Sequence, residues 1–511
     1  MSTINVPRPS DSDFFSPKTV RCSGGIIDGI EPSERFRLFL DGREMGLPPG
    51  AMILPGLVDT HCHLIGIGLM ASRVGLRGAA SAGECAERVA ERVRATAPGE
   101  WIVGFGWNQE EWTERRMPDR ATLDRLIADH PVALYRIDSH AVWLNGRALL
   151  EAGITPQRID GGSIELDERG EPTGILIDNA MKLVDRAIPP PTVERQRGWI
   201  EESVGECLRL GITEVHDMNV EPERLESMTR AADRGGMRLR CQVFLAAQNE
   251  EWAAVPRPVT LGPNLHIVGV KYFADGALGS RGALLLEPYS DAPGTRGLQL
   301  LDAGEIVRLA SEPLRRGFAV ATHAIGDGAN RIVLDAYAEL RAGFPESLLR
   351  MEHAQTVHPA DVPRFAAFGV IPAMQPTHCT SDAAMAEARL GPERCGYAYG
   401  WRSMLGSGVP ILGGSDFPIE SPDPLEGLRA FHFRRPAGGA EAWHPGEVIP
   451  RADAVAAYTA WAPLGIPGDH HRGRILPGAD ADIVVLSGNP FDDPGAAALL
   501  TIVGGEVVYR S

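Results

Sequence analysis

The feature that most constrains the fold is a repeated alternation of short apolar strands with amphipathic helices. Runs rich in β-branched residues end in polar residues, and helical patterns such as 303–316 and 327–341 follow them. This alternation is typical of a parallel sheet built from βα units. Strands are predicted at 52–58, 212–216, 238–245, 266–273, 318–324, 349–354, 369–375 and 409–413. Eight such units predict an α/β fold, the (β/α)8 or TIM barrel, whose chemistry lies at the carboxyl ends of the strands.

Three segments fall outside this repeat. The first two strands are too far apart for a simple connection, so residues 86–190 are expected to form an inserted α/β lid domain. Residues 1–54 and 467–511 both contain alternating, turn-punctuated strands, and we predict that they form one small β-sandwich domain from the two termini. The barrel then comprises residues 55–85, which include its first strand, and residues 191–466.

The charge balance narrows the class of partner. A net charge of −17 makes the surface repel phosphate backbones and anionic lipids, so we expect a small-molecule substrate and neither nucleic acid nor a membrane. The sequence contains no apolar run of about 18 residues and no basic segment followed by an apolar leader. We therefore expect that the protein neither spans a membrane nor is secreted. Seven scattered cysteines without a C-x-x-C pair favour the reducing cytoplasm. A homodimer is the default oligomeric expectation.

The strongest local signal is Asp59-Thr60-His61-Cys62-His63 at the end of the first predicted strand. Residues two apart on a strand point to the same face, so His61 and His63 are expected to enter the barrel mouth together. Neutral imidazole is the commonest nitrogen ligand of divalent metals. Taken alone, the motif is equally compatible with a chance pair of histidines on a loop.

Other predicted strands also end in titratable side chains, where a barrel keeps its reactive groups. These residues are His216 at strand 2, Lys271 in strand 4, His323 at strand 5, His353 at strand 6 and Asp416 just after strand 8. Core strands are expected to end in apolar or turn residues, so coincidence is a strained explanation for the whole set. Together with the paired histidines, the set predicts a divalent metal centre.

Lys271 has a specific chemical meaning at this position. Only three of the 50 basic residues are lysines. Beside metal ligands, like-charge repulsion and desolvation would lower the pKa of Lys271 and leave a free amine. A free amine can capture carbon dioxide as a carbamate, an anionic ligand that can bridge two metals, whereas the guanidinium of arginine stays protonated. The alternative is a lysine paired with a carboxylate such as Asp275.

Asp416 lies in a glycine-rich segment, GGSDFPIESPDP. A carboxylate that binds a metal and contacts its water can accept the water's proton, because coordination lowers the pKa of water to about 7. Asp416 is therefore the predicted catalytic base; a role as a helix N-cap suits Asp423 better. His216 and His140 are candidates for stabilising an oxyanion, and each is equally compatible with a place in the core or behind the metal ligands.

The chain resembles the amidohydrolase superfamily, in particular the branch that includes N-substituted formamide deformylase (amidohydrolase family 3). The resemblance rests on motifs in the same order along nearly the whole chain: ILPGLVDTHCH, GWNQEEW, SHAVWLNGRAL, VKYFADGALGSRGALLLEPY, THAIGDGAN, EHAQTVHPADVPRFAAFGVIPAMQPTH and GGSDFPIESPDPLEGLRAF. Several of these motifs exceed ten residues, which makes the resemblance specific.

The resemblance implies a set of roles. His61, His63 and Asp416 would bind one metal. His323 and His353 would bind the other, with carbamylated Lys271 as the bridge. Zinc is the usual metal of the family. The residues placed at the substrate are Trp107, His140 and the loop from Asp275 to Arg281.

The expected activity is hydrolysis of an amide-type C–N bond, in an N-substituted amide, a formamide or a cyclic amide. Two alternatives stay open. One is a mononuclear, deaminase-like hydrolase in which Lys271 is an unmodified lysine. The other is a catalytically silent regulatory barrel, and the retention of every ligand type speaks against it.

Overall fold

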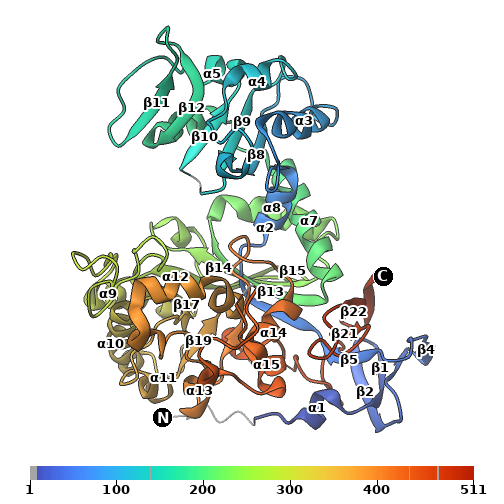
Figure 1. Cartoon of the computed structure of the whole chain (residues 1–511). Coiled ribbons are helices and arrows are strands. Elements are labelled where there is room, and N and C mark those ends of the chain that lie inside the picture. The colour runs from blue at the N-terminus through green and yellow to red at the C-terminus, as the bar shows by residue number, and fades with distance from the viewer. Residues whose placement is uncertain (1–7, 139, 437, 469–470) are drawn as a thin grey trace. The chain divides into compact units, whose positions relative to one another are not determined.

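The computed structural model describes residues 8–138, 140–436, 438–468 and 471–511 (Figure 1). The chain divides into two compact units. One unit consists of Met1–Ile67 and Gln196–Ser511, and the other is Gly68–Arg195.

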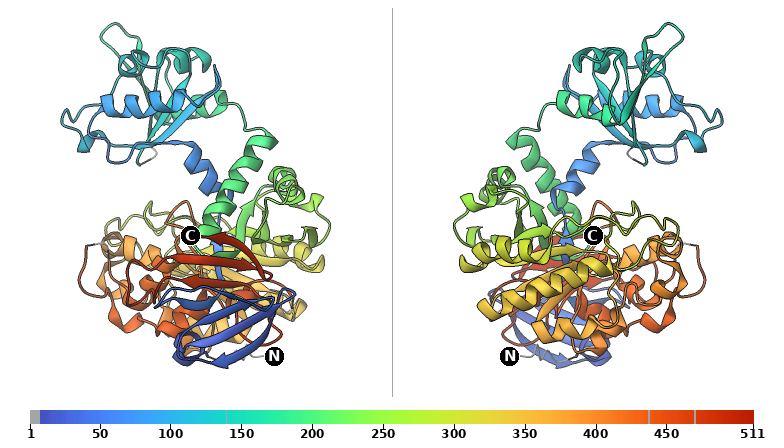
Figure 2. Two further views of the ribbon diagram at one scale, coloured as in Figure 1. Left: turned by 90° about the vertical axis from the view of Figure 1, so that its right-hand side faces the viewer. Right: turned by 90° about the vertical axis from the view of Figure 1, so that its left-hand side faces the viewer.

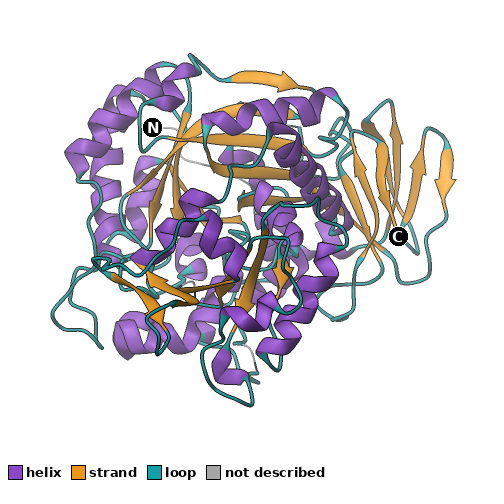
Figure 3. Ribbon diagram, turned by 90° about the horizontal axis from the view of Figure 1, so that it is seen from above, coloured by secondary structure: helices purple, strands orange, loops and turns teal. Residues whose placement is uncertain are grey.

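A parallel sheet forms the centre of the first unit, and helices lie around its strands (Figure 3). The strands follow one another round the sheet in sequence order, and β15 (Val259–Gly262) pairs antiparallel with β16. They are β6 (Leu57–Cys62), β13 (Ile212–Val220), β14 (Arg240–Ala246), β16 (Leu265–Phe273), β17 (Ala319–Ala324), β18 (Leu349–His353), β19 (Val370–Met374) and β20 (Leu412–Gly413). The hydroxyl of Thr60 donates to the carbonyl of Gly413 (2.9 Å) and joins the first strand to the last. The predicted barrel is confirmed.

Helices follow the barrel strands along the chain. They include α7 (Val193–Arg209), α8 (Leu225–Asp233), α9 (Ala303–Arg315), α10 (Asp327–Gly343), α11 (Val362–Phe368), α12 (Pro376–Cys395), α13 (Trp401–Gly406), α14 (Pro424–Phe433) and α15 (Arg451–Ala457). Local chemistry sets their ends. Helix α9 begins at a capping box in which Asp302 and Glu305 each accept a backbone N–H of the other. Helix α11 ends at Gly369, whose φ of 60° is left-handed.

The predicted first strand, 52–58, is in fact two strands. β5 (Met52–Pro55) pairs antiparallel with β21 in a terminal sheet, whereas β6 starts the barrel. Gly56 separates them, and a Cβ at this position would lie 2.2 Å from Thr213 Oγ1. Both strands are fully buried, so the apolar pattern runs through the break and does not reveal it.

The two ends of the chain form two four-stranded sheets that lie side by side (Figure 2). Their orders are β2-β1-β3-β4 and β23-β22-β21-β5. The strands are β1 (Lys18–Ser23), β2 (Ile26–Pro32), β3 (Arg37–Leu40), β4 (Arg43–Met45), β21 (Ile483–Leu486), β22 (Ala498–Val503) and β23 (Glu506–Arg510), and a short helix α1 (Asp11–Phe15) precedes them. Buried residues of both sheets, including Val20, Leu38, Ile53 and Ile483, share one core. This is the small β-domain that was predicted from the two termini.

The second unit contains a six-stranded mixed sheet in the order β11-β12-β10-β9-β8-β7. Its elements are β7 (Val74–Gly75), α3 (Ala82–Val93), β8 (Ile102–Trp107), α4 (Arg120–Asp124), β9 (Val132–Arg136), β10 (Ala141–Leu144), α5 (Gly146–Glu151), β11 (Gly162–Leu166), β12 (Pro172–Asp178) and α6 (Lys182–Ala187). Helix α2 (Ile65–Ser72) spans the boundary between the units. The second unit begins before the predicted residue 86, because β7 pairs with β8 and Cys85 and Val89 of α3 pack in its core.

The structure also describes the cysteines and the apolar character of the helices. All seven cysteines are buried and carry free thiols. Within the ranges that the structure describes, no helix combines the length and the apolar character needed to cross a membrane.

A network of charged and polar side chains lies in the barrel interior, where apolar layers are usual. Arg350 and Glu352, both 0% exposed, lie on β18. Arg350 Nε and Nη2 donate to the Glu352 carboxylate (2.8 and 3.0 Å), and Nη1 donates to Nδ1 of His216 (2.9 Å). The ring nitrogen Nδ1 of His61 lies 2.6 Å from Glu352 Oε2. This hydrogen-bonded network therefore reaches His61, one of the predicted metal ligands.

Arg350 also joins several parts of the barrel. It donates to the carbonyls of Thr60 and Gly465 (2.9 Å each), and its guanidinium lies 4.9 Å from the ring centroid of Phe244. Burial raises the pKa of Glu352, but Arg350 and then Lys271 outweigh burial and hold that pKa well below its usual value. Glu352 is therefore an ionised carboxylate with Arg350 as its main counter-charge.

Replacing Arg350 by Met should lower the free energy of unfolding by about 3–5 kcal/mol, because Glu352 is left as a buried charge without its partner. The double variant Arg350→Met/Glu352→Met removes both charges and should lose less than the single variant. Thermal unfolding of the chelator-treated proteins, followed by circular dichroism, measures both losses. If the double variant is as unstable as Arg350→Met or more so, the pair is not the electrostatic unit described here.

Candidate metal centre

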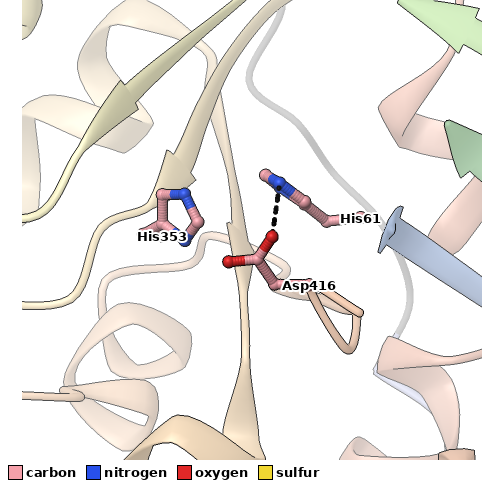
Figure 4. Close-up of side chains that lie close together, drawn as sticks. All are labelled: His61, His353 and Asp416. Carbon is pink, nitrogen blue, oxygen red and sulfur yellow. Dashed lines mark ion pairs between the residues drawn. The ribbon is translucent and has the colours of Figure 1, made fainter. Parts of the chain in front are cut away.

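Three buried side chains converge at the carboxyl ends of the barrel strands (Figure 4). His61 is the second-last residue of β6, His353 ends β18, and Asp416 follows β20. Each offers one ligand atom, and these atoms lie within 4.8 Å of one another. Nε2 of His61 is 3.5 Å from Asp416 Oδ1. Imidazole nitrogen with carboxylate oxygen is a donor set that suits zinc and similar divalent ions.

Two more of the predicted ligands border this cluster. Nε2 of His63 lies 3.2 Å from Asp416 Oδ1, so both histidines of the paired motif face the same carboxylate oxygen. The ring of His323 lies 4.4 Å from the ring of His353, centroid to centroid. The structure thus brings all four histidines and Asp416 into one group.

Backbone hydrogen bonds hold the first and last strand ends together. The N–H of Asp416 donates to the carbonyl of His61 (2.7 Å), and the N–H of His63 donates to the carbonyl of Phe417 (3.0 Å). Asp416 has a left-handed φ of 56°. Gly414 is required beside it, because a Cβ there would lie 2.6 Å from the backbone nitrogen of His61. The positions of His61, His63 and Asp416 are therefore fixed by main-chain contacts as well as by their side-chain contacts.

Asp59, the first residue of the paired motif, ties the same two segments through its side chain. Its carboxylate accepts the N–H groups of His61 (3.1 Å) and Ser415 (3.0 Å) and the Ser415 hydroxyl (2.6 Å). Burial raises the pKa of Asp59 to about 6, against the opposing effect of these hydrogen bonds.

In three histidines, Nδ1 contacts a residue outside the cluster, so that Nε2 is the nitrogen available within it. The Nδ1 atom of His61 contacts Glu352 (2.6 Å), that of His63 contacts the carbonyl of Met218 (2.9 Å), and that of His353 contacts Oε1 of Gln375 (2.7 Å). These acceptors select the tautomer in which Nδ1 carries the proton and Nε2 offers its lone pair. This is the arrangement that orients histidines in metal sites.

Lys271 and His323 have buried nitrogens without a hydrogen-bond partner among the described residues. They are Lys271 Nζ and His323 Nε2. Burying a polar atom without a hydrogen-bond partner costs free energy, and a bound ligand at that atom would remove the cost. Burial lowers the pKa of Lys271 to about 8, although Glu352 and Asp416 act in the opposite direction. Nε2 of His323 makes no hydrogen bond in the described part of the chain, but it lies 3.4 Å from Asp275 Oδ1. The donor set and the amine of Lys271, which lacks a hydrogen bond to any described residue, fit a bound divalent metal, and they fit a lysine that reacts as a free amine.

Burial also controls the charge of the other members. Burial, then Lys271, lowers the pKa of His61 to about 4, and burial, then His323, lowers the pKa of His353 well below its usual value. Burial raises the pKa of Asp416, but His61 and His63 outweigh it and hold that pKa well below its usual value. Neutral imidazoles and an ionised carboxylate are the forms that bind metal.

The residues predicted to contact substrate lie in different surroundings. Asp275 is 1% exposed and accepts three backbone N–H groups, from Leu284, Ile325 and Gly326. Arg281 is ion-paired with Asp291 (2.9 Å).

His216 is 0% exposed inside the barrel, between Arg350 and Glu214. In the second unit, Trp107 is 0% exposed in the core and His140 is exposed and contacts Asp178 (2.8 Å). Of the five residues, Asp275 borders the group around Asp416, since its Oδ1 lies 3.4 Å from Nε2 of His323. The roles of all five at the substrate stay predictions.

Sequence reasoning missed the residues that support the ligands. Arg350 and Glu352 stand at alternate positions of the buried strand β18, and this pair of charges was the available signal. Gln375 follows β19 directly before Pro376, a weaker signal of the same kind. His378 follows on α12, and its Nε2 lies 3.8 Å from Asp416 Oδ2.

Several known proteins are similar to this chain in sequence or in fold. Residues 49–509 match the model of a family described as the amidohydrolase family. Protein LONG AFTER FAR-RED 3 of Arabidopsis thaliana is 34% identical over 484 residues, which cover 90% of this chain and 82% of that protein. N-substituted formamide deformylase of Arthrobacter pascens is 26% identical over 496 residues, which cover 88% and 86%.

A solved structure is similar as well. An uncharacterized metal-dependent hydrolase from Pyrococcus furiosus has a TM-score of 0.76 and 28% identity, over 93% of this chain and 99% of that one. The match of the family model to most of the chain, with the barrel and the group of histidines and carboxylate described above, shows that this chain belongs to the amidohydrolase family.

Proposed function

We propose that this protein is a metal-dependent hydrolase that cleaves an amide-type carbon–nitrogen bond in an N-substituted amide, a formamide or a cyclic amide. The observation that carries the proposal is the convergence of His61, His353 and Asp416 within 4.8 Å in the barrel mouth. Two relatives support it by name. The similar structure from Pyrococcus furiosus is described as a metal-dependent hydrolase, and the relative from Arthrobacter pascens is named N-substituted formamide deformylase.

In this proposal, the six predicted ligands hold two divalent ions, with zinc as the expected metal. His61, His63 and Asp416 would hold one, and His323 and His353 the other, with Lys271 between them as a carbamate. A divalent ion bound there would acidify a water molecule and polarise a carbonyl oxygen. The lowered pKa of Lys271, about 8, supports the carbamate because only the free amine reacts with carbon dioxide.

Asp416 has the proton-transfer role. Its Oδ1 faces His61 and His63, so Oδ2 is the oxygen left to accept a proton from the water that attacks the amide carbon. The same carboxyl group then returns the proton to the leaving nitrogen. Glu352 and Gln375 hold the rings of His61 and His353 through their Nδ1 atoms, and they act only through those rings.

The substrate contacts, the location and the assembly of the protein stay as predicted from the sequence. Trp107, His140, His216, Asp275 and Arg281 stay the predicted substrate-contacting residues. The cytoplasm stays the predicted location, and a homodimer the predicted assembly.

A site with a single ion is the second candidate, because the three residues that converge most closely form one group. In that case Lys271 stays an unmodified lysine and the chemistry is deaminase-like. Elemental analysis separates the candidates, since the first requires two ions in each chain and the second requires one.

Replacing Lys271 by Ala should abolish hydrolysis in a panel of N-acyl, formamide and cyclic amide substrates, because the bridging ligand is lost. Small added carboxylates should restore part of the activity. The wild-type protein should carry an additional mass equal to carbon dioxide on the peptide that contains Lys271, under conditions that preserve carbamates. Full activity of the Ala variant would contradict the bridging role.

Replacing Gln375 by Met should weaken metal binding roughly 10- to 100-fold, because His353 loses the acceptor that orients its ring. Gln375→Glu keeps an acceptor oxygen and should bind metal more tightly than Gln375→Met. Competition with a chelator of known affinity measures the three proteins. Equal affinity in all three would show that Gln375 does not position His353.

A further inference from the structure

His378 is a buried histidine beside Asp416, and it has no role in the proposed mechanism. It lies on the first turn of α12 and is 8% exposed. Its Nε2 lies 3.8 Å from Asp416 Oδ2, beyond hydrogen-bond distance, and has no hydrogen-bond partner among the described residues. Its ring is nearly parallel to that of His353, with centroids 6.3 Å apart and an interplanar angle of 12°.

The unpartnered nitrogen of His378 differs from those of Lys271 and His323. Those two belong to the predicted ligand set, so bound metal would satisfy them. His378 lies instead on the Oδ2 side of Asp416, whereas His61 and His63 face Oδ1. Oδ2 is the oxygen that we assign to proton transfer, so His378 borders the position of the reacting substrate. A buried imidazole nitrogen without a partner calls for one, and the substrate is the molecule that arrives there.

The start of α12 adds positive potential at this place. Pro376 is the first helical residue, and the preceding Gln375 makes no side-chain cap; its Oε1 contacts His353 instead. The helix runs without interruption to Leu390, before the kink at Gly391, so its dipole is substantial. Within the described chain, the hydroxyl oxygen of Thr377 is likewise buried without a hydrogen-bond partner. Uncapped N–H groups at a helix start favour a negatively charged oxygen.

We propose that His378 is a substrate-binding residue whose Nε2 hydrogen-bonds an anionic oxygen of the substrate. The first turn of α12 stabilises the negative charge of that oxygen. The oxygen is either a carboxylate that the substrate carries or the amide oxygen as it gains charge during attack. This inference rests on the proposed function, because Asp416 marks the reacting centre.

Binding of two probes to the metal-loaded full chain tests the proposal by isothermal titration calorimetry. N-acetylglycine carries a carboxylate, and its neutral analogue N-acetylglycinamide serves as the reference for it. Methylphosphonate is anionic and tetrahedral, as the attacked carbonyl becomes. Replacing His378 by Phe keeps a ring and removes the nitrogen. It should weaken binding of one anionic probe roughly 10- to 100-fold, the loss expected for a hydrogen bond to a charged group.

The probe that is affected identifies the oxygen. A loss for N-acetylglycine but not for N-acetylglycinamide assigns a substrate carboxylate, and a loss for methylphosphonate assigns the developing oxyanion. Equal affinities of the wild type and His378→Phe for both anions would overturn the proposal, and so would the absence of binding to the wild type. If the Phe variant does not fold, His378→Leu takes its place.

Two controls separate this inference from the proposed function. Thr380→Val is the matched control, because the Thr380 hydroxyl donates to the carbonyl of Thr377 within the same helix (2.9 Å). It should bind both probes like the wild type. The metal content of every variant is measured first. A wild type that binds no metal contradicts the proposed function, whereas metal-loaded variants with unchanged affinities contradict only the role of His378.

Discussion

The buried ion pair between Arg350 and Glu352 is the interaction on which the site depends most. Neither side chain reaches solvent, so each charge must be satisfied inside the barrel. Arg350 does so with five hydrogen bonds, two of them to Glu352 and the others to the His216 ring and two carbonyls. The Glu352 carboxylate is then free to orient His61, whose other nitrogen faces Asp416. A buried ion pair thus replaces apolar packing beneath the candidate metal ligands.

Closure of the barrel is the second condition for the site. The paired histidines come from the first strand and Asp416 from the segment after the last, so they meet only if these strands are neighbours. Asp59 bonds to both segments, and Gly414 lets the two backbones approach. The donor set is therefore complete only in the closed barrel. Residues far apart in the sequence become one group of ligands by this closure.

The sequence predicts the barrel well because its strands and helices have distinct periodicities, and the strand ends carry unusual titratable residues. The break at Gly56 escapes prediction, since buried strands on both sides leave the apolar pattern continuous. The supporting roles of Glu352 and Gln375 depend on which strand lies beside which, and periodicity contains no such information. The unpartnered nitrogen of His378 depends on where α12 starts relative to Asp416. Local pattern therefore finds the candidate ligands, and only the folded chain shows what orients them.

We propose that the group around Asp416 holds a divalent metal. Anomalous diffraction from crystals of the purified protein, recorded on both sides of the zinc absorption edge, tests this proposal. We expect an anomalous peak in contact with Nε2 of His61 and the carboxylate of Asp416. A second peak near Lys271 and His323 is expected for the two-ion site. A crystal grown with zinc that shows no peak among these residues would show that the group is not a zinc site.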